Sequence, residues 1–157
     1  MGNKTLIYKQ KLEHTLNENY THLQRVEEAF YALEKQYTLP FTKDEYKNIL
    51  NSPQDLAFSD QIIYRFSKLQ DSMGAKLFKS ILLYEGENVD KPFLDILNQL
   101  EKMGILDVDE WFEIRDLRNE ISHEYDDSEQ TARNILNMIY ELKEDLKKIL
   151  EAITKLI

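Results

Sequence analysis

Apolar residues recur every three or four positions along most of the chain, which is the spacing of amphipathic helices. The pattern is clearest near the C-terminal end, where Lys and Glu fill the gaps between seven apolar positions: Ile135, Ile139, Leu142, Leu146, Ile149, Ile153 and Leu156. This alternation of four and three is typical of a long helix that packs at a shallow angle against its neighbours. Ser128 precedes the stretch, and we expect it to cap the helix.

Five further segments combine helical spacing with residues that start or stop helices. The first three are a helix from about Thr5 to Tyr37, a short helix that the capping-box residues Thr42-Lys43-Asp44-Glu45 open and that ends near Leu50, and a helix that starts at Asn51-Ser52-Pro53, with Pro53 in its first turn, and has its apolar positions from Asp55 through Ile81. The last two are a short helix that Asp90 and Pro92 open and Gly104 closes, and a helix that Asp107 or Asp109 caps and that carries Trp111 to Ser122. Gly74 interrupts the third helix at modest cost, which indicates that another helix approaches closely there.

The composition favours helices over a β fold. The 157 residues include only four Gly and three Pro, whereas sandwiches and barrels need a turn roughly every 8–12 residues. A chain of this length can bury a sizeable core, and it contains no internal repeat and no linker-like stretch. We therefore predict an all-α fold, an antiparallel up-and-down bundle of five or six helices that forms a single domain over residues 1–157.

Cysteine and hydropathy narrow the classes of protein further. The absence of cysteine excludes disulfides, thiolate metal sites and a cysteine nucleophile. The longest apolar run, Ile81-Leu82-Leu83-Tyr84, is far shorter than a membrane span, and the first residues lack the apolar core of a signal peptide. We expect a soluble, cytoplasmic protein that has no membrane partner.

The net charge of −9 limits how the chain can bind nucleic acids. Such binding depends largely on the neutralisation of phosphates by Lys and Arg, so a chain this acidic is not a general nucleic-acid coat. A solvated acidic surface that favours solubility explains most of the charge. Binding to RNA would need a local basic cleft or the help of a partner.

Polar side chains gather at the end of the predicted helix that carries Trp111. They are Arg115, Arg118, Asn119, Ser122, His123 and, just beyond, Tyr125. A helix that packs through an apolar stripe does not need this cluster of polar side chains for its packing. Asn119 and His123 are four residues apart and share a face. Arg118 and His123 are five apart, about 140° around an ideal helix, so they converge only if the arginine reaches across or the helix ends near His123.

These residue types suit the cleavage of a phosphodiester in RNA. His123 titrates near neutrality and can take the proton of a 2′-hydroxyl, while the planar cation of Arg118 can stabilise charge that builds on phosphorus. Neither step requires a metal or a cofactor. One histidine cannot easily serve as both base and acid, whereas two copies across a cleft supply both. We therefore expect a symmetric homodimer.

A purely structural explanation of the same residues stays open. Arg118 can pair with a nearby carboxylate from Asp116, Glu120 or Glu124. His123 can then simply cap the helix, since a cation is favoured at a helix C-terminus. The other two histidines, His14 and His22, are expected at the surface. The absence of Glu-x-x-His pairs argues against a di-iron bundle.

The run Arg118-Asn119-Glu120-Ile121-Ser122-His123 resembles the Arg-x4-His signature of HEPN domains. Tyr125 extends it to Arg-x4-His-x-Tyr, which resembles the HepT branch of that superfamily. The stretch Asp60–Asp71 is similar to the second helix of HepT-like proteins. The helix order and the size agree with this family over most of the chain.

The resemblance implies a metal-independent endoribonuclease toxin of a toxin–antitoxin pair, active as a homodimer with an RNA cleft between the protomers. It makes Arg118 and His123 catalytic, with Asn119 in support, and makes Tyr125 the hydroxyl to which an MNT-type nucleotidyltransferase antitoxin adds AMP. The added anion would repel RNA from the cleft. The supporting or RNA-binding residues are expected to be Arg65, Lys68, Asp71 and Arg115, with Asp71 orienting a side chain of the motif. The superfamily also implies an alternative, a non-catalytic substrate-binding or regulatory subunit of a nucleotidyltransferase.

Overall fold

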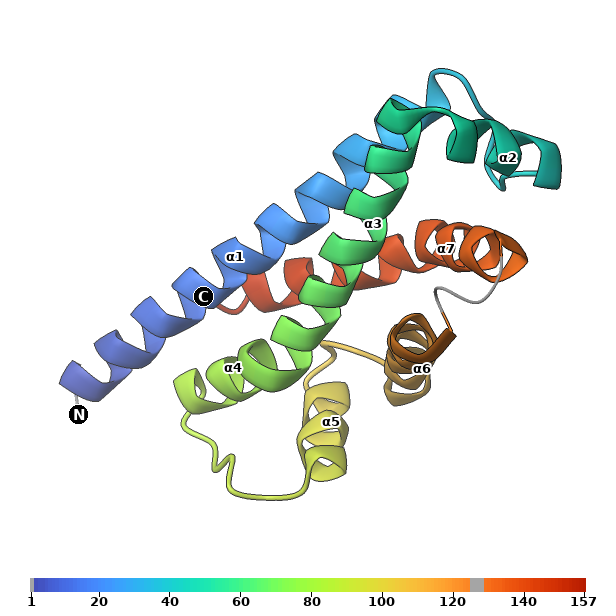
Figure 1. Cartoon of the computed structure of the whole chain (residues 1–157). Coiled ribbons are helices and arrows are strands. Elements are labelled where there is room, and N and C mark those ends of the chain that lie inside the picture. Colours follow the sequence, from blue (N-terminus) through green and yellow to red (C-terminus); the bar gives the residue numbers. More distant parts are fainter. Residues whose placement is uncertain (1, 125–128) are drawn as a thin grey trace.

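A computed structural model of the chain describes residues 2–124 and 129–157, with the backbone alone at residues 123, 124, 129 and 130. All regular structure in these ranges is helical (Figure 1). The elements are α1 (Gly2–Glu34), α2 (Lys43–Asn51), α3 (Pro53–Ser72), the π-helical turn η1 (Met73–Leu77), α4 (Phe78–Tyr84), α5 (Phe93–Lys102), α6 (Val108–Glu124) and α7 (Glu129–Thr154). Since α3, η1 and α4 run on without a break, the described residues form six helical rods, and the predicted all-α bundle is confirmed.

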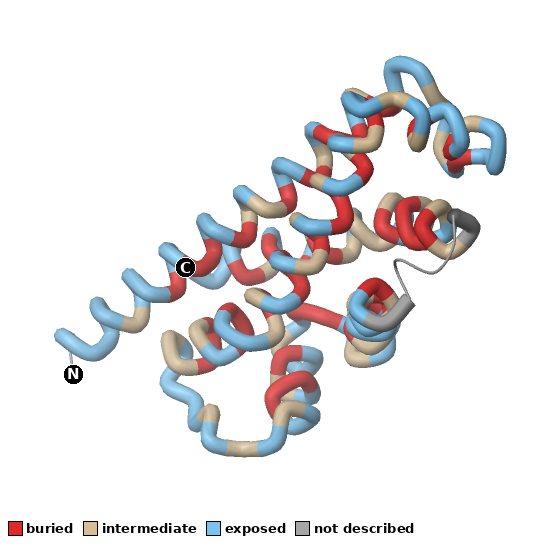
Figure 2. The backbone as a smooth tube through the Cα atoms, viewed as in Figure 1, coloured by how far each residue is buried: buried red, intermediate tan, exposed pale blue. Residues whose placement is uncertain are grey.

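The long helices α1 and α3 lie side by side in opposite directions and form the main contact of the bundle (Figure 1). The helix α7 packs across both of them, and α6 packs against α3 and α7. The buried positions follow the inner faces of these helices, while their outer faces are exposed (Figure 2). The largest fully buried side chains are Trp111, Phe30, Phe41, Phe66 and Phe78.

The predicted start signals of α2 and α3 are confirmed. The Thr42 hydroxyl accepts a hydrogen bond from the Glu45 backbone N–H, and the Glu45 carboxylate accepts from the Thr42 N–H in return. A further hydrogen bond from the Thr38 N–H to Glu45 helps to hold the pKa of that carboxyl below its ordinary value. The Ser52 side chain caps α3, which begins at Pro53, the residue predicted for its first turn.

The close approach predicted at Gly74 is also confirmed. A Cβ atom at this position would lie 3.4 Å from Cζ2 of Trp111, at the short end of van der Waals contact, so α6 comes close to the backbone here. The Trp111 ring also meets Phe78 edge to face, with their centroids 4.7 Å apart. The π-helical turn η1 begins one residue before Gly74, and such turns reorient the faces of a helix.

The start of α6 is fixed by two carboxylates. Of the two predicted caps it is Asp107 that acts, because its Oδ1 accepts a hydrogen bond of 3.0 Å from the Glu110 N–H. Glu101 at the end of α5 accepts another, of 2.7 Å, from the Val108 N–H. Gly104 lies between the two helices with φ of 76°, a conformation that favours glycine, and so closes α5 as predicted. The predicted cap of α7, Ser128, lies outside the described residues.

None of the described helices combines the length and the apolar character that crossing a lipid bilayer would demand.

Candidate functional site

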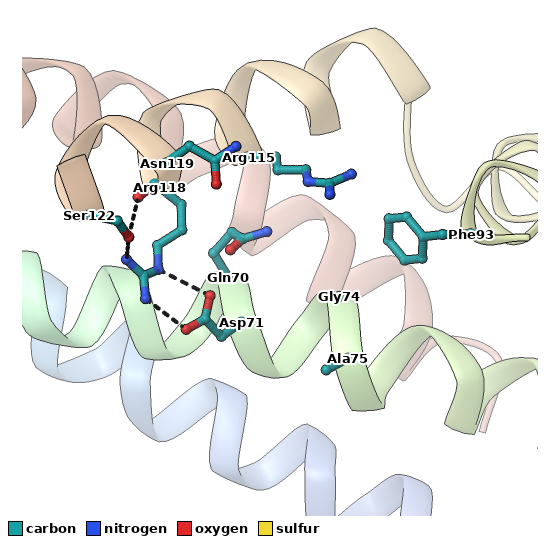
Figure 3. Close-up of a pocket in the computed structure, with 9 residues that line it drawn as sticks. All are labelled: Gln70, Asp71, Gly74, Ala75, Phe93, Arg115, Arg118, Asn119 and Ser122. Atoms are coloured by element: carbon teal, nitrogen blue, oxygen red, sulfur yellow. Dashed lines mark hydrogen bonds and ion pairs between the residues drawn. The ribbon is translucent and has the colours of Figure 1, made fainter.

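Two open grooves flank the C-terminal half of α6. Groove A lies between α3 with η1, α5 and α6, has a volume of about 470 Å³, and is shown in Figure 3. Its lining residues are Gln70, Asp71, Gly74, Ala75, Phe93, Arg115, Arg118, Asn119 and Ser122. Groove B lies between α3 and α6 and has a volume of about 380 Å³. Its lining residues are Asp60, Ile63, Tyr64, Ser67, Lys68, Asp71, Arg118 and Ile121.

Arg118 and Asp71 line both grooves and form a bidentate ion pair between them. The Nε and Nη2 atoms of Arg118 each donate to one carboxylate oxygen of Asp71 at 3.0 Å. The Nη1 atom donates to the Ser122 hydroxyl at 2.6 Å, so the guanidinium is held on two sides (Figure 3). Parallel hydrogen bonds of this kind fix an arginine more firmly than a single contact does.

Among the described side chains, Arg118 pairs with none of the carboxylates that the sequence brings near it, and the Glu124 side chain lies outside the described residues. Asp116, Glu120 and Glu124 were the candidates, yet the pairing residue lies on α3, 47 positions earlier in the chain. Asp71, expected to orient a side chain of the motif, therefore holds Arg118 in place. The Arg118 side chain is 24% exposed and that of Asp71 is 50% exposed, so solvent still screens the pair.

Arg115 and Asn119 lie along α6 on the side of groove A (Figure 3). The Arg115 side chain points toward α5, and its guanidinium carbon is 5.9 Å from the centroid of the Phe93 ring. Phe93 is the first residue of α5, and the sequence alone did not mark it as part of a site. Groove A therefore offers a cation, an aromatic ring and an amide in one concave surface.

Lys68 and Arg65, the two α3 cations that were expected to support the site, lie in different surroundings. Lys68 lines groove B. Arg65 instead faces α1, where its Nη1 lies 3.1 Å from Nδ1 of His22. His22, expected at the surface, is therefore half-buried, and its pKa is lowered first by burial and then by the charge of Arg65. His14 is exposed as expected and contacts Glu18.

The remaining residues of the motif are placed only in part. His123 is on the last turn of α6, but its side chain lies outside the described part of the chain. Tyr125 lies outside the described residues altogether. Among the side chains that are described, no group of three or more His, Asp or Glu residues is arranged to hold a metal ion.

The sequence alone did not identify several residues that line the grooves, because their place in a groove depends on which helices pack together. They are Gln70, Gly74, Ala75 and Phe93 in groove A and Tyr64 in groove B. One signal was available for Tyr64, because Asp60, Tyr64, Ser67, Lys68 and Asp71 recur at helical spacing on one face of α3. A polar face on a helix that is otherwise buried is a candidate site.

Both grooves lie within the part of the chain that matches a known family. Residues 21–155 match the family described as "Nucleotidyltransferase substrate binding protein like". The chain belongs to this family. No curated protein and no solved structure matches the chain significantly.

Membership of the nucleotidyltransferase substrate-binding family supports the broader part of the resemblance that the motif indicated, which is the HEPN superfamily. The family is HEPN-like, so the chain is of the HEPN type. Its description also ties the chain to nucleotidyltransferases, the class of partner that the resemblance implied. All of α2 to α7 and the C-terminal part of α1 fall within the match.

The Asp71–Arg118 pair should show a measurable coupling energy. We expect a double-mutant cycle with Asp71→Ala and Arg118→Ala to give about 1 kcal/mol, near the upper end for partly exposed pairs because the contact is bidentate. The free energy of unfolding in urea is the measurement. The exposed Arg25–Glu28 pair on α1 is the matched control, because it has a single contact of 3.0 Å and should show a smaller coupling. A coupling no larger than that of the control would contradict the assignment.

His22 should make the protein less stable in acid. Because its pKa is lowered in the folded state, unfolding takes up a proton, and the loss of stability begins as the pH falls below the ordinary value of 6.5. We expect NMR titration of the imidazole to give a pKa below 6.5, and Arg65→Gln to raise it. His22→Gln should remove this part of the acid sensitivity in urea denaturation. A titration of His22 at or above 6.5 would count against the buried contact.

Proposed function

We propose that this protein is a non-catalytic subunit that binds substrate for a nucleotidyltransferase or regulates it. The family match over residues 21–155 carries the proposal, because it covers both grooves and names this role. The ion pair adds a physical argument. Arg118 is already neutralised by Asp71, so the isolated chain does not present a free arginine at the motif.

Groove A has the properties of a binding surface. Its volume of about 470 Å³ falls within the range of small-molecule sites, roughly 300–1,000 Å³. The guanidinium of Arg115 suits a phosphate, which it can bind through two parallel hydrogen bonds. Phe93 offers an apolar ring beside it, and Asn119 both donates and accepts hydrogen bonds. None of these groups needs to react in order to hold a phosphorylated substrate.

Coexpression with a nucleotidyltransferase from the same genome tests this role. We expect the two proteins to elute together in size-exclusion chromatography with light scattering, and the KM of nucleotidyl transfer to be lower in the complex. Arg115→Ala should raise the KM about tenfold, as expected for one charged contact, and leave the complex intact. Arg25→Ala on α1, outside both grooves, is the control and should change neither quantity. A stable complex with an unaffected KM would refute substrate binding.

A second candidate is the endoribonuclease of a toxin–antitoxin pair, favoured by the position of Arg118, Asn119 and His123 on the last turns of α6. In this mechanism His123 takes the proton of the 2′-hydroxyl, and the 2′-oxygen attacks phosphorus as the bond to the 5′-oxygen breaks. The leaving oxygen receives a proton from His123 of a second copy in a homodimer. Arg118 stabilises the charge on the phosphoryl oxygens, and Asp71 must then share or release it. Transfer of AMP to Tyr125 would switch the activity off.

RNA cleavage in the presence of EDTA distinguishes the two candidates. The second candidate requires cleavage that falls by roughly 100-fold or more in His123→Ala, the usual contribution of a general base, and that is also lost in Arg118→Ala. His14→Ala is the matched control, since that imidazole is exposed on α1. Under the leading proposal the purified chain leaves RNA intact. An increase in mass by one AMP at Tyr125 would favour the second candidate.

A further inference from the structure

The first turns of α1 extend past the rest of the bundle (Figure 1). Leu12 is the first buried residue of this helix, and residues 2–11 are exposed apart from the half-buried Tyr8. They also precede residues 21–155, which match the family, so the family description does not account for them. This projecting segment, residues 2–11, therefore offers most of its surface to other molecules.

Charge and apolar character set the projecting segment apart from the rest of the chain. It contains three lysines and no Asp or Glu, whereas the chain as a whole has a net charge of −9. Its two aliphatic side chains, Leu6 and Ile7, are 54% and 49% exposed. A cationic surface that exposes aliphatic side chains fits a partner that offers an apolar group among carboxylates.

Lys4, Ile7 and Lys11 form one stripe of the projecting segment. They are spaced i, i+3 and i+7, so they lie on one face across two helical turns. Neither lysine forms an ion pair with a described residue, whereas Lys9, on a different face, lies 4.0 Å from Glu13. The stripe thus presents an aliphatic group between two cations that the bundle does not neutralise.

The outer face of α6 has the same spacing with the opposite charge. Asp109, Phe112 and Asp116 are also spaced i, i+3 and i+7. Both aspartates are exposed and Phe112 is half-buried, and neither carboxylate forms an ion pair with a described residue. An aromatic group between two carboxylates on α6 therefore complements an aliphatic group between two cations on α1.

Burial distinguishes this stripe from another one with the same spacing. Glu27, Phe30 and Glu34 on α1 repeat the pattern of an aromatic residue between two carboxylates. Phe30 is only 1% exposed, however, and Glu27 is half-buried. An aromatic ring that is buried in its own core cannot contact a second molecule, so α6 offers the better complement.

We infer that the projecting segment of α1 docks on the outer face of α6 in a second copy of this chain. Ile7 packs against Phe112, and Lys4 and Lys11 pair with the two aspartates. An anionic lipid surface would also attract the lysines, but it would repel a chain with a net charge of −9. The contact joins two different surfaces, so each copy can bind a further copy and the assembly grows with concentration.

The docking face on α6 adjoins groove A. Arg115 and Asn119, which line that groove, follow Phe112 and Asp116 by three residues each and so lie beside them on the helix. The docked segment therefore borders groove A and brings a lysine of the second copy to its rim. The inference does not depend on the proposed function, because self-association needs no nucleotidyltransferase.

Sedimentation velocity of the full chain over a range of concentrations tests the inference. We expect the average mass to rise with concentration and to fall at high salt, which screens exposed charges. Reversal of the lysines (Lys4→Glu with Lys11→Glu) or of the aspartates (Asp109→Lys with Asp116→Lys) should abolish this dependence on concentration. A mixture of the two variants should associate again, because the projecting segment of each then meets a stripe of opposite charge on the other.

Lys9→Glu with Lys35→Glu is the matched control for the reversed lysines. It changes the net charge equally but lies outside the stripe, so association should stay as in the wild type. Ile7→Ala should weaken association about tenfold, through the loss of one buried aliphatic side chain. An average mass that is independent of concentration would overturn the inference, and so would a mixture of the reversed variants that fails to associate. If the wild type alone stays monomeric and the reversed lysines instead abolish the complex with the nucleotidyltransferase, the segment binds that enzyme and not a second copy.

Discussion

The contact between Trp111 and the backbone at Gly74 decides where the rest of the site lies. The indole ring is fully buried between η1 and Phe78, so α6 cannot slide or turn on α3 without exposing it. Arg118 follows seven residues after Trp111 on α6, about two helical turns along the same face. Asp71 precedes Gly74 by three residues on the opposing helix. The packing of one large and one minimal residue therefore brings the two charges together.

The cations around the two grooves differ in the groups that they contact. The chain carries a net charge of −9, yet the grooves keep positive groups on their rims. Arg118 is bound to Asp71, and Arg65 contacts His22 on α1. Arg115 and Lys68 remain beside aromatic rings, Phe93 in groove A and Tyr64 in groove B. An acidic protein can thus keep cations in local grooves while its overall charge discourages unspecific binding of nucleic acids.

The sequence predicted those features that depend on neighbours along the chain. The capping box at Thr42, the start of α3 at Pro53 and the closure at Gly104 each need only a few consecutive residues. The first helix was predicted to reach Tyr37 but ends at Glu34, and the Tyr37 hydroxyl donates a hydrogen bond to Asp55 on α3. Long-range pairing cannot be read from local patterns, and only the family resemblance led us to expect Asp71 beside a side chain of the motif. Nothing local distinguishes Asp71 from the carboxylates nearer to Arg118, or shows that Arg65 faces α1.

The shared wall between the two grooves makes them thermodynamically dependent on each other. A ligand in groove A that drew Arg118 away from Asp71 would leave an uncompensated carboxylate facing groove B, and this surface would then attract anions less. Linkage requires that an anion in groove B disfavour the first ligand by the same factor. A single ion pair would thus be enough to couple the two grooves.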